Sequence, residues 1–175
     1  MHITFLRHGI AINYYDPQCP VDFERYLTDQ GIERMESIAK WMEKEEFGFD
    51  RIYTSPLVRA RQTAEIVAKC LKATAKMEVA NSLSCGASLS EIRALLKNAG
   101  KSEKILLVGH APDFGHAVSL LIGAKSTIHY PISLKKGGFA GVRADKIYKN
   151  EGELLYLIQP KLIVGKKKLH NQKVA

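Results

Sequence analysis

Apolar residues along the chain follow two periods, and their alternation predicts a layered α/β domain. Short apolar runs typical of buried strands occupy residues 3–6, 51–54 and 104–109. Between them, apolar residues recur at three- and four-residue spacing over residues 28–46 and 57–71, which is the period of an amphipathic helix. Strands that alternate with helices of this length favour a mostly parallel sheet covered by helices.

Further segments extend this alternation toward the C-terminal half of the chain. Residues 77–80 resemble a third short strand, and residues 88–99 and 112–122 carry apolar residues at helical spacing. Residues 139–143 and 154–158 are strand-like with no helical segment between them, which predicts an antiparallel hairpin at one edge of the sheet. We therefore expect a three-layer α/β/α sandwich with a mostly parallel sheet and an antiparallel edge strand.

The composition is that of an ordinary soluble domain. The chain has 175 residues, of which 46% are apolar and 25% charged, so one domain with its own core is expected. No apolar run approaches the length of a membrane-spanning helix. The cysteines Cys19, Cys70 and Cys85 form neither a metal-binding pair nor an even disulfide set, which is typical of a reducing cytoplasm. We expect a cytoplasmic protein that acts as a monomer.

The net charge of +8 is unevenly distributed along the chain, and this distribution bears on which partners the protein binds. Residues 161–175 contain five lysines and no acidic residue, which leaves 21 basic and 18 acidic residues, a net +3, in residues 1–160. We therefore divide the chain into a domain over 1–160 and a basic, flexible tail over 161–175. A module that binds nucleic acid or an anionic membrane is the alternative, but aromatic residues do not interleave with the lysines, so we expect neither partner.

Side chains suited to phosphate chemistry follow three of the predicted strands. They are Arg7-His8-Gly9 after the first strand, Ser55-Pro56 and then Arg59 after the second, and His110-Ala111-Pro112 after the strand at 104–109. In open α/β sheets, ligands bind at the carboxyl ends of the strands. If these three strands are neighbours, two histidines and two arginines converge on one pocket.

This set of residue types can bind a phosphoryl group and react with it. The planar guanidinium of arginine matches oxyanions, and neutral imidazole is a nucleophile toward phosphorus. Gly9 would let the backbone approach a ligand, and a helix that begins at Pro112 would direct backbone N–H groups, including that of Ala111, at the same pocket. Arg61 is as compatible with a solvated helix position as with a ligand contact. No acidic cluster or His-x-x-x-His pair accompanies the histidines, so we expect no metal site.

Taken with their order and spacing, these motifs resemble the histidine phosphatase superfamily. The matching segments are Arg7-His8-Gly9, Leu27-Thr28-x-x-Gly31, the run YTSPLVRARQTA from Tyr53 to Ala64, and Leu107-Val108-Gly109-His110. The short chain, the Leu27-Thr28-x-x-Gly31 spacing and Leu83-x-Cys85-Gly86 look like the small SixA-type phosphohistidine phosphatases. The fold implied by the resemblance is that of the phosphoglycerate mutase-like proteins, in agreement with the sandwich expected above.

The resemblance also implies a site and a mechanism. His8 would be the nucleophile that accepts the phosphoryl group, and Arg7 and Arg59 would clamp the phosphoryl oxygens. His110 would complete the pocket with a hydrogen bond to an equatorial oxygen. Water would then release phosphate from the phosphohistidine. Neither a metal nor an organic cofactor is implied, because fixed cations supply the electrostatic stabilisation.

One departure from the superfamily pattern bears on the leaving group. Residues 81–90, where many members carry an acidic general acid, contain no carboxylate, and Glu91 is spaced to close a capping box with Ser88. A leaving alkoxide needs a proton from a positioned acid, whereas a protonated imidazole leaves readily, so the site is biased toward N–P bonds. The acid remains unassigned among Asp16, Asp22 and Asp113.

The short connecting segments bear on the size of the substrate. The segment after Gly9 soon reaches the predicted helix at Thr28, and the segment after Gly86 soon enters another helix, so no long insertion covers the pocket. A shallow pocket admits a side chain displayed on a protein, and we expect phosphohistidine in a phosphoprotein as the substrate. The alternative is a phosphomonoesterase or mutase of the same superfamily that acts on a small phosphorylated metabolite.

Overall fold

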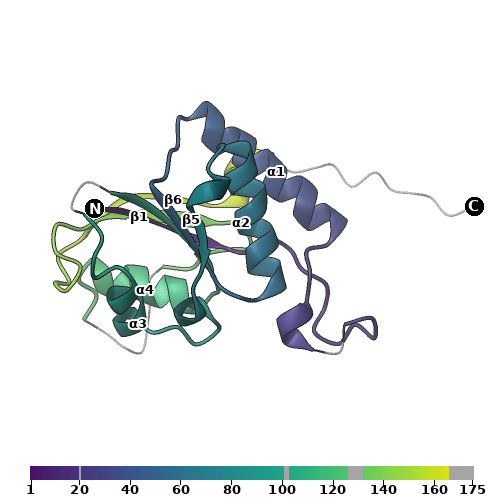
Figure 1. Cartoon of the computed structure of the whole chain (residues 1–175), viewed down its shortest axis with the longest axis horizontal. Coiled ribbons are helices and arrows are strands. Elements are labelled where there is room, and N and C mark those ends of the chain that lie inside the picture. The colour runs from purple at the N-terminus through teal and green to yellow at the C-terminus, as the bar shows by residue number, and fades with distance from the viewer. Residues whose placement is uncertain (20, 101–102, 126–131, 166–175) are drawn as a thin grey trace, which may run out of the picture.

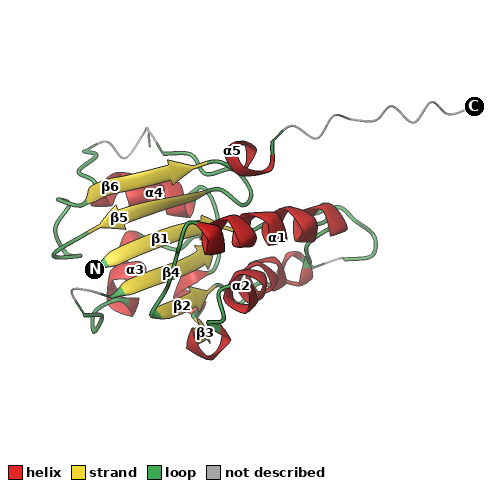
Figure 2. Cartoon of the chain, turned by 90° about the horizontal axis from the view of Figure 1, so that it is seen from above, coloured by secondary structure: helices red, strands yellow, loops and turns green. Residues whose placement is uncertain are grey.

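The strands and helices predicted from the apolar pattern are present, with ends shifted by a few residues. The computed structural model describes residues 1–19, 21–100, 103–125 and 132–165 (Figures 1 and 2). The strands are β1 (His2–Arg7), β2 (Arg51–Thr54), β3 (Met77–Val79), β4 (Lys104–Gly109), β5 (Phe139–Arg143) and β6 (Glu153–Ile158). The α-helices are α1 (Asp29–Lys44), α2 (Val58–Cys70), α3 (Leu89–Leu95), α4 (Asp113–Leu121) and α5 (Pro160–Val164), and short 3-10 turns include η1 (Asp22–Glu24).

The strands form one sheet in the order β3-β2-β4-β1-β5-β6, as Figure 2 shows. The pairs β3–β2, β2–β4 and β4–β1 are parallel, whereas β5 is antiparallel to both β1 and β6. The predicted terminal hairpin is therefore confirmed. The strand that runs opposite to the others is β5, one position in from the edge. The edge strand β6 is antiparallel to β5 and therefore runs in the same direction as β1.

Helices cover both faces of the sheet, with α1 and α2 on one side and α3 and α4 on the other (Figure 1). Alternate residues of β1 serve the two cores: Ile3 and Phe5 pack with the α3–α4 side, whereas Leu6 packs with the α1–α2 side. In β4, Leu107 and Val108 divide in the same way. Both faces are buried, which explains why the central strands are continuous apolar runs and do not alternate with polar residues.

Two helices begin at the capping residues that the sequence suggests. Thr28 precedes α1, and its hydroxyl accepts a hydrogen bond from the Gly31 N–H (3.0 Å). Ser88 and Glu91 form the expected capping box at the start of α3. Glu91 is therefore committed to the end of a helix, as its spacing predicts.

The tail boundary predicted at Lys161 is wrong by a few residues. Pro160 to Val164 form α5, and the apolar side chains Ile163 and Val164 pack against the core on the α1–α2 side. A proline in the first turn favours this helix, and the apolar pair anchors it, a signal too short to recognise as periodic. The KKK run at 166–168 lies outside the described residues. No helix in the described ranges is long and apolar enough to cross a membrane.

Candidate active site

The order of the sheet brings three of the strand ends together. β4 lies between β1 and β2 and pairs with both in parallel, and Arg7 at the end of β1 is in register with Gly109 at the end of β4. The pairing continues for one residue, since the His8 N–H donates to the Gly109 carbonyl (3.0 Å). His8, Arg59 and His110 are all buried here, at 6%, 3% and 3% exposure. The neighbouring strands on which the sequence argument depended are thus confirmed.

The ring of His8 is held in one tautomer. Its Nδ1 lies 2.7 Å from the Gly9 carbonyl oxygen, which can only accept, so Nδ1 carries the proton. Its Nε2 accepts a hydrogen bond from Nε of Arg59 (3.3 Å) and therefore presents a lone pair. Burial is the largest cause that lowers the pKa of His8; the Gly9 hydrogen bond opposes it, His110, Arg59 and Arg7 add to it, and the resulting pKa is about 3. His8 is consequently neutral at physiological pH, with Nε2 available as a nucleophile.

Arg59, the second residue of α2, is the most heavily bonded group of the site. Besides Nε, its Nη1 donates to the Asp22 carbonyl (2.7 Å) and its Nη2 donates to the Asp22 carboxylate (3.1 Å). The same carboxylate pairs with Arg25 (2.9 Å). Partial burial alone would raise the pKa of Asp22, but the hydrogen bonds and charges of Arg25 and Arg59 outweigh it and lower that pKa. A carboxylate thus occupies the side of Arg59 that a phosphoryl oxygen would use.

The three alternatives for a general acid are therefore not equivalent. Asp22 reaches the site, but its lowered pKa keeps it ionised, which is unsuited to donating a proton. The Asp113 carboxylate accepts the Gly86 N–H (2.8 Å), and the Asp16 carboxylate accepts the Gln18 N–H (3.0 Å) within its own loop. Asp22 is therefore unsuited to protonating an alkoxide leaving group, and the contacts of Asp16 and Asp113 assign that role to neither of them.

His110 faces His8 across the site, with ring centroids 5.3 Å apart. Its Nε2 lies 2.8 Å from Oγ of Ser55, and that hydroxyl also accepts the Leu57 N–H (3.3 Å). When Ser55 donates to Nε2, the single proton of the neutral ring lies on Nδ1, a buried atom without a hydrogen-bond partner. Burial, together with Arg59 and Arg7, lowers the pKa of His110 to about 4 against the opposing charge of Asp22. His110 is thus a neutral donor at physiological pH.

Arg7 extends from the end of β1 and is half-buried. Its Nη1 donates to the Leu134 carbonyl (2.8 Å), whereas its Nε is buried without a partner. Arg7 Nε and His110 Nδ1 are two of the three such side-chain atoms in the described part of the chain. Unpaired buried donors are unfavourable in a folded protein, and their occurrence together indicates a site built to receive an acceptor.

Gly9 serves the site differently from the prediction. Its N–H donates to Oγ1 of Thr63 (3.0 Å), so that amide is already engaged, and Thr63 in turn donates to the Arg59 carbonyl (2.7 Å). A Cβ at Gly9 would lie 2.8 Å from Cγ of Met35 and 3.2 Å from Leu27. The glycine is therefore needed for close packing against α1, and it orients His8 through its carbonyl. The expected contact of Gly9 with phosphate stays a prediction.

Of the other residues considered from the sequence, Ala111 lies beside the site and Arg61 lies on the surface. Ala111 is half-buried between His110 and α4, where the expected contact of its backbone with phosphate stays a prediction. Arg61 is exposed on α2 and lies on its solvated side. Sequence reasoning assigned no role to Ser55 and Thr63, although both lie within the YTSPLVRARQTA run. Among the described residues, no group of three or more His, Cys, Asp or Glu side chains is placed to hold a metal ion.

Comparison with known proteins agrees with this arrangement. Residues 3–84 match the family model of the histidine phosphatase superfamily, branch 1. An uncharacterized protein of Picosynechococcus sp. is 35% identical over 94% of this chain and 99% of its own length. Phosphohistidine phosphatase SixA of Escherichia coli is 31% identical over 69% of this chain and 74% of its own. The structure of the protein histidine phosphatase SixA complexed with tungstate superposes with a TM-score of 0.78, at 25% identity over 91% of this chain and 97% of that one.

Sequence and fold thus lead to the same family. The histidines and arginines at the strand ends belong to the motifs that resemble those of the superfamily. The sheet order is that of a phosphoglycerate mutase-like α/β fold. The chain belongs to the histidine phosphatase superfamily, as a SixA-like member.

Proposed function

We propose that this phosphatase hydrolyses phosphohistidine in a protein substrate, through a covalent phosphohistidine on His8. The observation that carries the proposal is the state of the His8 ring: neutral, with its proton fixed on Nδ1 and its Nε2 lone pair beside Arg59. A nucleophile must present such a lone pair toward an electrophile that cations hold in place.

The first step transfers the phosphoryl group to the enzyme. Phosphoryl oxygens replace the Asp22 carboxylate on Arg59 and accept from Arg7 and from Nδ1 of His110. Nε2 of His8 gives up its hydrogen bond from Nε of Arg59 and forms a bond to phosphorus as the bond from phosphorus to the leaving nitrogen breaks in line. The leaving imidazole departs as a neutral ring, because its second nitrogen has taken up a proton from solvent before the bond breaks and keeps it. The Gly9 carbonyl stabilises the positive charge that His8 gains.

The second step returns the enzyme to its starting state. Water attacks the phosphorus atom, the bond to Nε2 breaks, and inorganic phosphate leaves after the water has lost a proton to phosphate or solvent. The His8 ring is again neutral with Nδ1 bound to Gly9. The Asp22 carboxylate can then return to Arg59, so that product release exchanges one anion for another.

The choice of a nitrogen leaving group follows from the acids of the site. An alkoxide would need a proton, yet Asp22 has a lowered pKa and Glu91 is held in the α3 capping box. A phosphohistidine donor needs no such acid beyond the proton on its own ring. This favours the N–P substrate over a phosphate ester of a small metabolite, which remains the competing function within the superfamily.

A substrate panel separates these two functions. We expect kcat/KM for a phosphohistidine-containing protein to exceed that for sugar phosphates by about 100-fold or more, the size of a missing general-acid contribution. Phosphoramidate, which has the N–P bond without the protein, is expected between them. Higher kcat/KM on sugar phosphates would replace the proposal by a small-molecule phosphomonoesterase. Transfer of the phosphoryl group to a second sugar would indicate a mutase.

A further inference from the structure

A second hollow opens beside the catalytic pocket and carries an excess of positive charge. This cationic cleft, of about 880 Å³, includes Arg7, Arg34, Lys135, Lys136, Lys161 and Gln159 in its walls. None of the described residues that line it is acidic. Because Arg7 lines this cleft and directly precedes His8 at the end of β1, a ligand in the cleft would lie next to the phosphoryl group.

The cleft is built rigidly onto the strand that carries the nucleophile. The Gly137 N–H donates to the carbonyls of Arg7 (3.0 Å) and His8 (3.1 Å). The side chain of Gln159 accepts the Lys135 N–H (3.0 Å) and donates to the Ser133 carbonyl (2.7 Å). The segment that carries Lys135 and Lys136 is thus fixed relative to His8, and the distance between cleft and nucleophile is set by the fold.

Among the described residues, none of the five cations of the cleft is in an ion pair. Lys136 is half-buried, and its pKa is lowered by burial and then by the charges of Arg7, Arg25 and Arg59. Lys135 and Lys161 are exposed at the rim. A local excess of one sign in a partly closed hollow focuses the field there and attracts anions.

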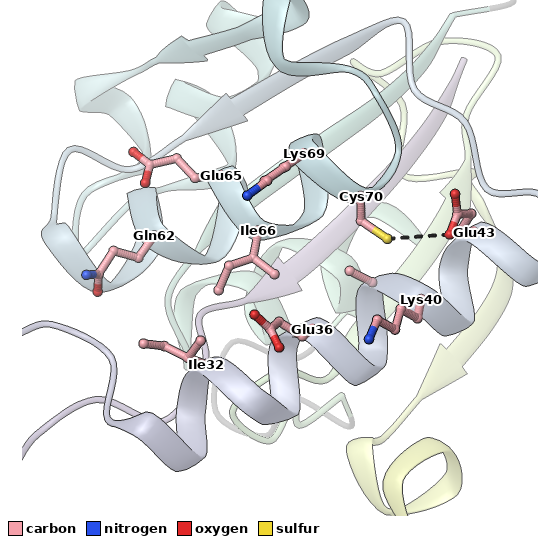
Figure 3. Close-up of a pocket in the computed structure, with 10 residues that line it drawn as sticks. Ile32, Glu36, Lys40, Glu43, Gln62, Glu65, Ile66, Lys69 and Cys70 are labelled. Carbon is pink, nitrogen blue, oxygen red and sulfur yellow. Dashed lines mark hydrogen bonds between the residues drawn. The ribbon is translucent and has the colours of Figure 1, made fainter.

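The groove between α1 and α2 shows that this excess is local (Figure 3). That groove, of about 630 Å³, contains Lys40 and Lys69, but Glu36, Glu43 and Glu65 lie among them. Lysines in the groove are therefore compensated, and those in the cationic cleft are not. The two hollows supply matched positions for an experiment.

We propose that the cationic cleft binds acidic side chains that flank the phosphohistidine on the protein substrate. The inference rests on the proposed function and adds to it a preference for an acidic surface. Three of the five cations are lysines, which act as mobile point charges and suit several carboxylates of variable position. Apolar walls at Ile10 and Pro160 suit the aliphatic parts of a protein surface.

The test uses two phosphohistidine peptides of equal length, with glutamates around the phosphohistidine in one and glutamines in the other. The wild-type protein is expected to have a kcat/KM about tenfold higher on the glutamate peptide, mainly through KM, with the difference shrinking as salt is added. The double variant Lys135→Glu with Lys161→Glu is expected to lose this preference. It should keep its rates on the glutamine peptide and on phosphoramidate within about twofold.

The matched control is Lys40→Glu with Lys69→Glu, which makes the same change of net charge in the α1–α2 groove and is expected to keep the preference. Equal rates of the wild-type protein on both peptides, or an equal loss of preference in both double variants, would overturn the cleft proposal alone. Failure to hydrolyse either peptide while sugar phosphates are turned over would overturn the proposed function and, with it, the cleft proposal.

Discussion

The catalytic site and the α1–α2 groove both contain ionisable side chains, but those of the site, His8, Arg59 and His110, are buried, whereas the charged residues of the groove are exposed. In the groove, Glu36, Lys40 and Lys69 are exposed and mixed in sign. In the pocket, His8 and His110 are buried, and burial is the largest cause of their lowered pKa values. Reactivity in this molecule therefore arises from where the sheet ends bury polar groups, and the number of charged residues in a hollow is a poor guide to it.

Replacing a buried histidine and an exposed one on the same strand gives the sharpest form of this comparison. His8→Ala is expected to lower kcat by about 10⁴-fold or more, since it removes the proposed nucleophile. His2→Ala, at the exposed start of β1, is expected to leave kcat within about twofold of the wild-type value. The measurement is steady-state hydrolysis of phosphoramidate, with circular dichroism to confirm folding. Comparable losses in both variants would mean that His8 acts only through structure.

Two arginines on α2 provide the next pair. Arg59→Ala is expected to lower kcat/KM by about 10²–10³-fold, the usual effect of removing a preorganised donor to a transition-state oxygen. Arg59→Lys should recover little, because an ammonium lacks the planar pair of N–H donors with which a guanidinium binds two phosphoryl oxygens. Arg61→Ala, exposed two residues along the same helix, should change kcat/KM little. A fully active Arg59→Lys variant would contradict the role given to the guanidinium fork.

A smaller effect is expected for the free energy of unfolding, which should depend on pH through the titration of His8. The folded pKa of His8, about 3, lies below its ordinary value of 6.5, so the unfolded chain binds this proton first as the pH falls. The stability that neutral His8 contributes is complete above about pH 6.5 and is lost as the pH drops toward 3. Urea unfolding at about pH 7 and pH 5 should show a larger loss for the wild-type protein than for His8→Asn. Equal losses would show that burial does not hold His8 neutral.

The sequence predicts the site better than it predicts what surrounds the site. His8, Arg59 and His110 follow strands whose apolar runs are unmistakable, so sheet order alone brings them together. Gly9 was expected at the ligand because a glycine pattern cannot distinguish room for a ligand from close packing against Met35. The contact of Asp22 with Arg59 depends on how a loop folds back, which no period encodes.

The cationic cleft could not be predicted from the sequence either, because it is also formed by contacts between distant segments. Lys135 and Lys136 look like an exposed loop pair, and their relation to Arg7 arises through the Leu134 carbonyl and the Gln159 side chain. Lys161 was assigned to a flexible tail, although α5 ties it to the rim of the cleft. Contacts between segments distant in the chain carry no local signature, whereas strands and capped helices do.

The central claim is that the phosphoryl group passes through Nε2 of His8, and trapping that intermediate tests it most directly. The protein is mixed with a ³²P-phosphohistidine protein, quenched within milliseconds in alkali, digested and mapped. His110→Ala, which should slow turnover, is included to raise the amount trapped. The account predicts an acid-labile, alkali-stable label on the peptide that contains His8, and no label in His8→Ala. Release of labelled phosphate at the normal rate by His8→Ala, or a label on another residue, would contradict it.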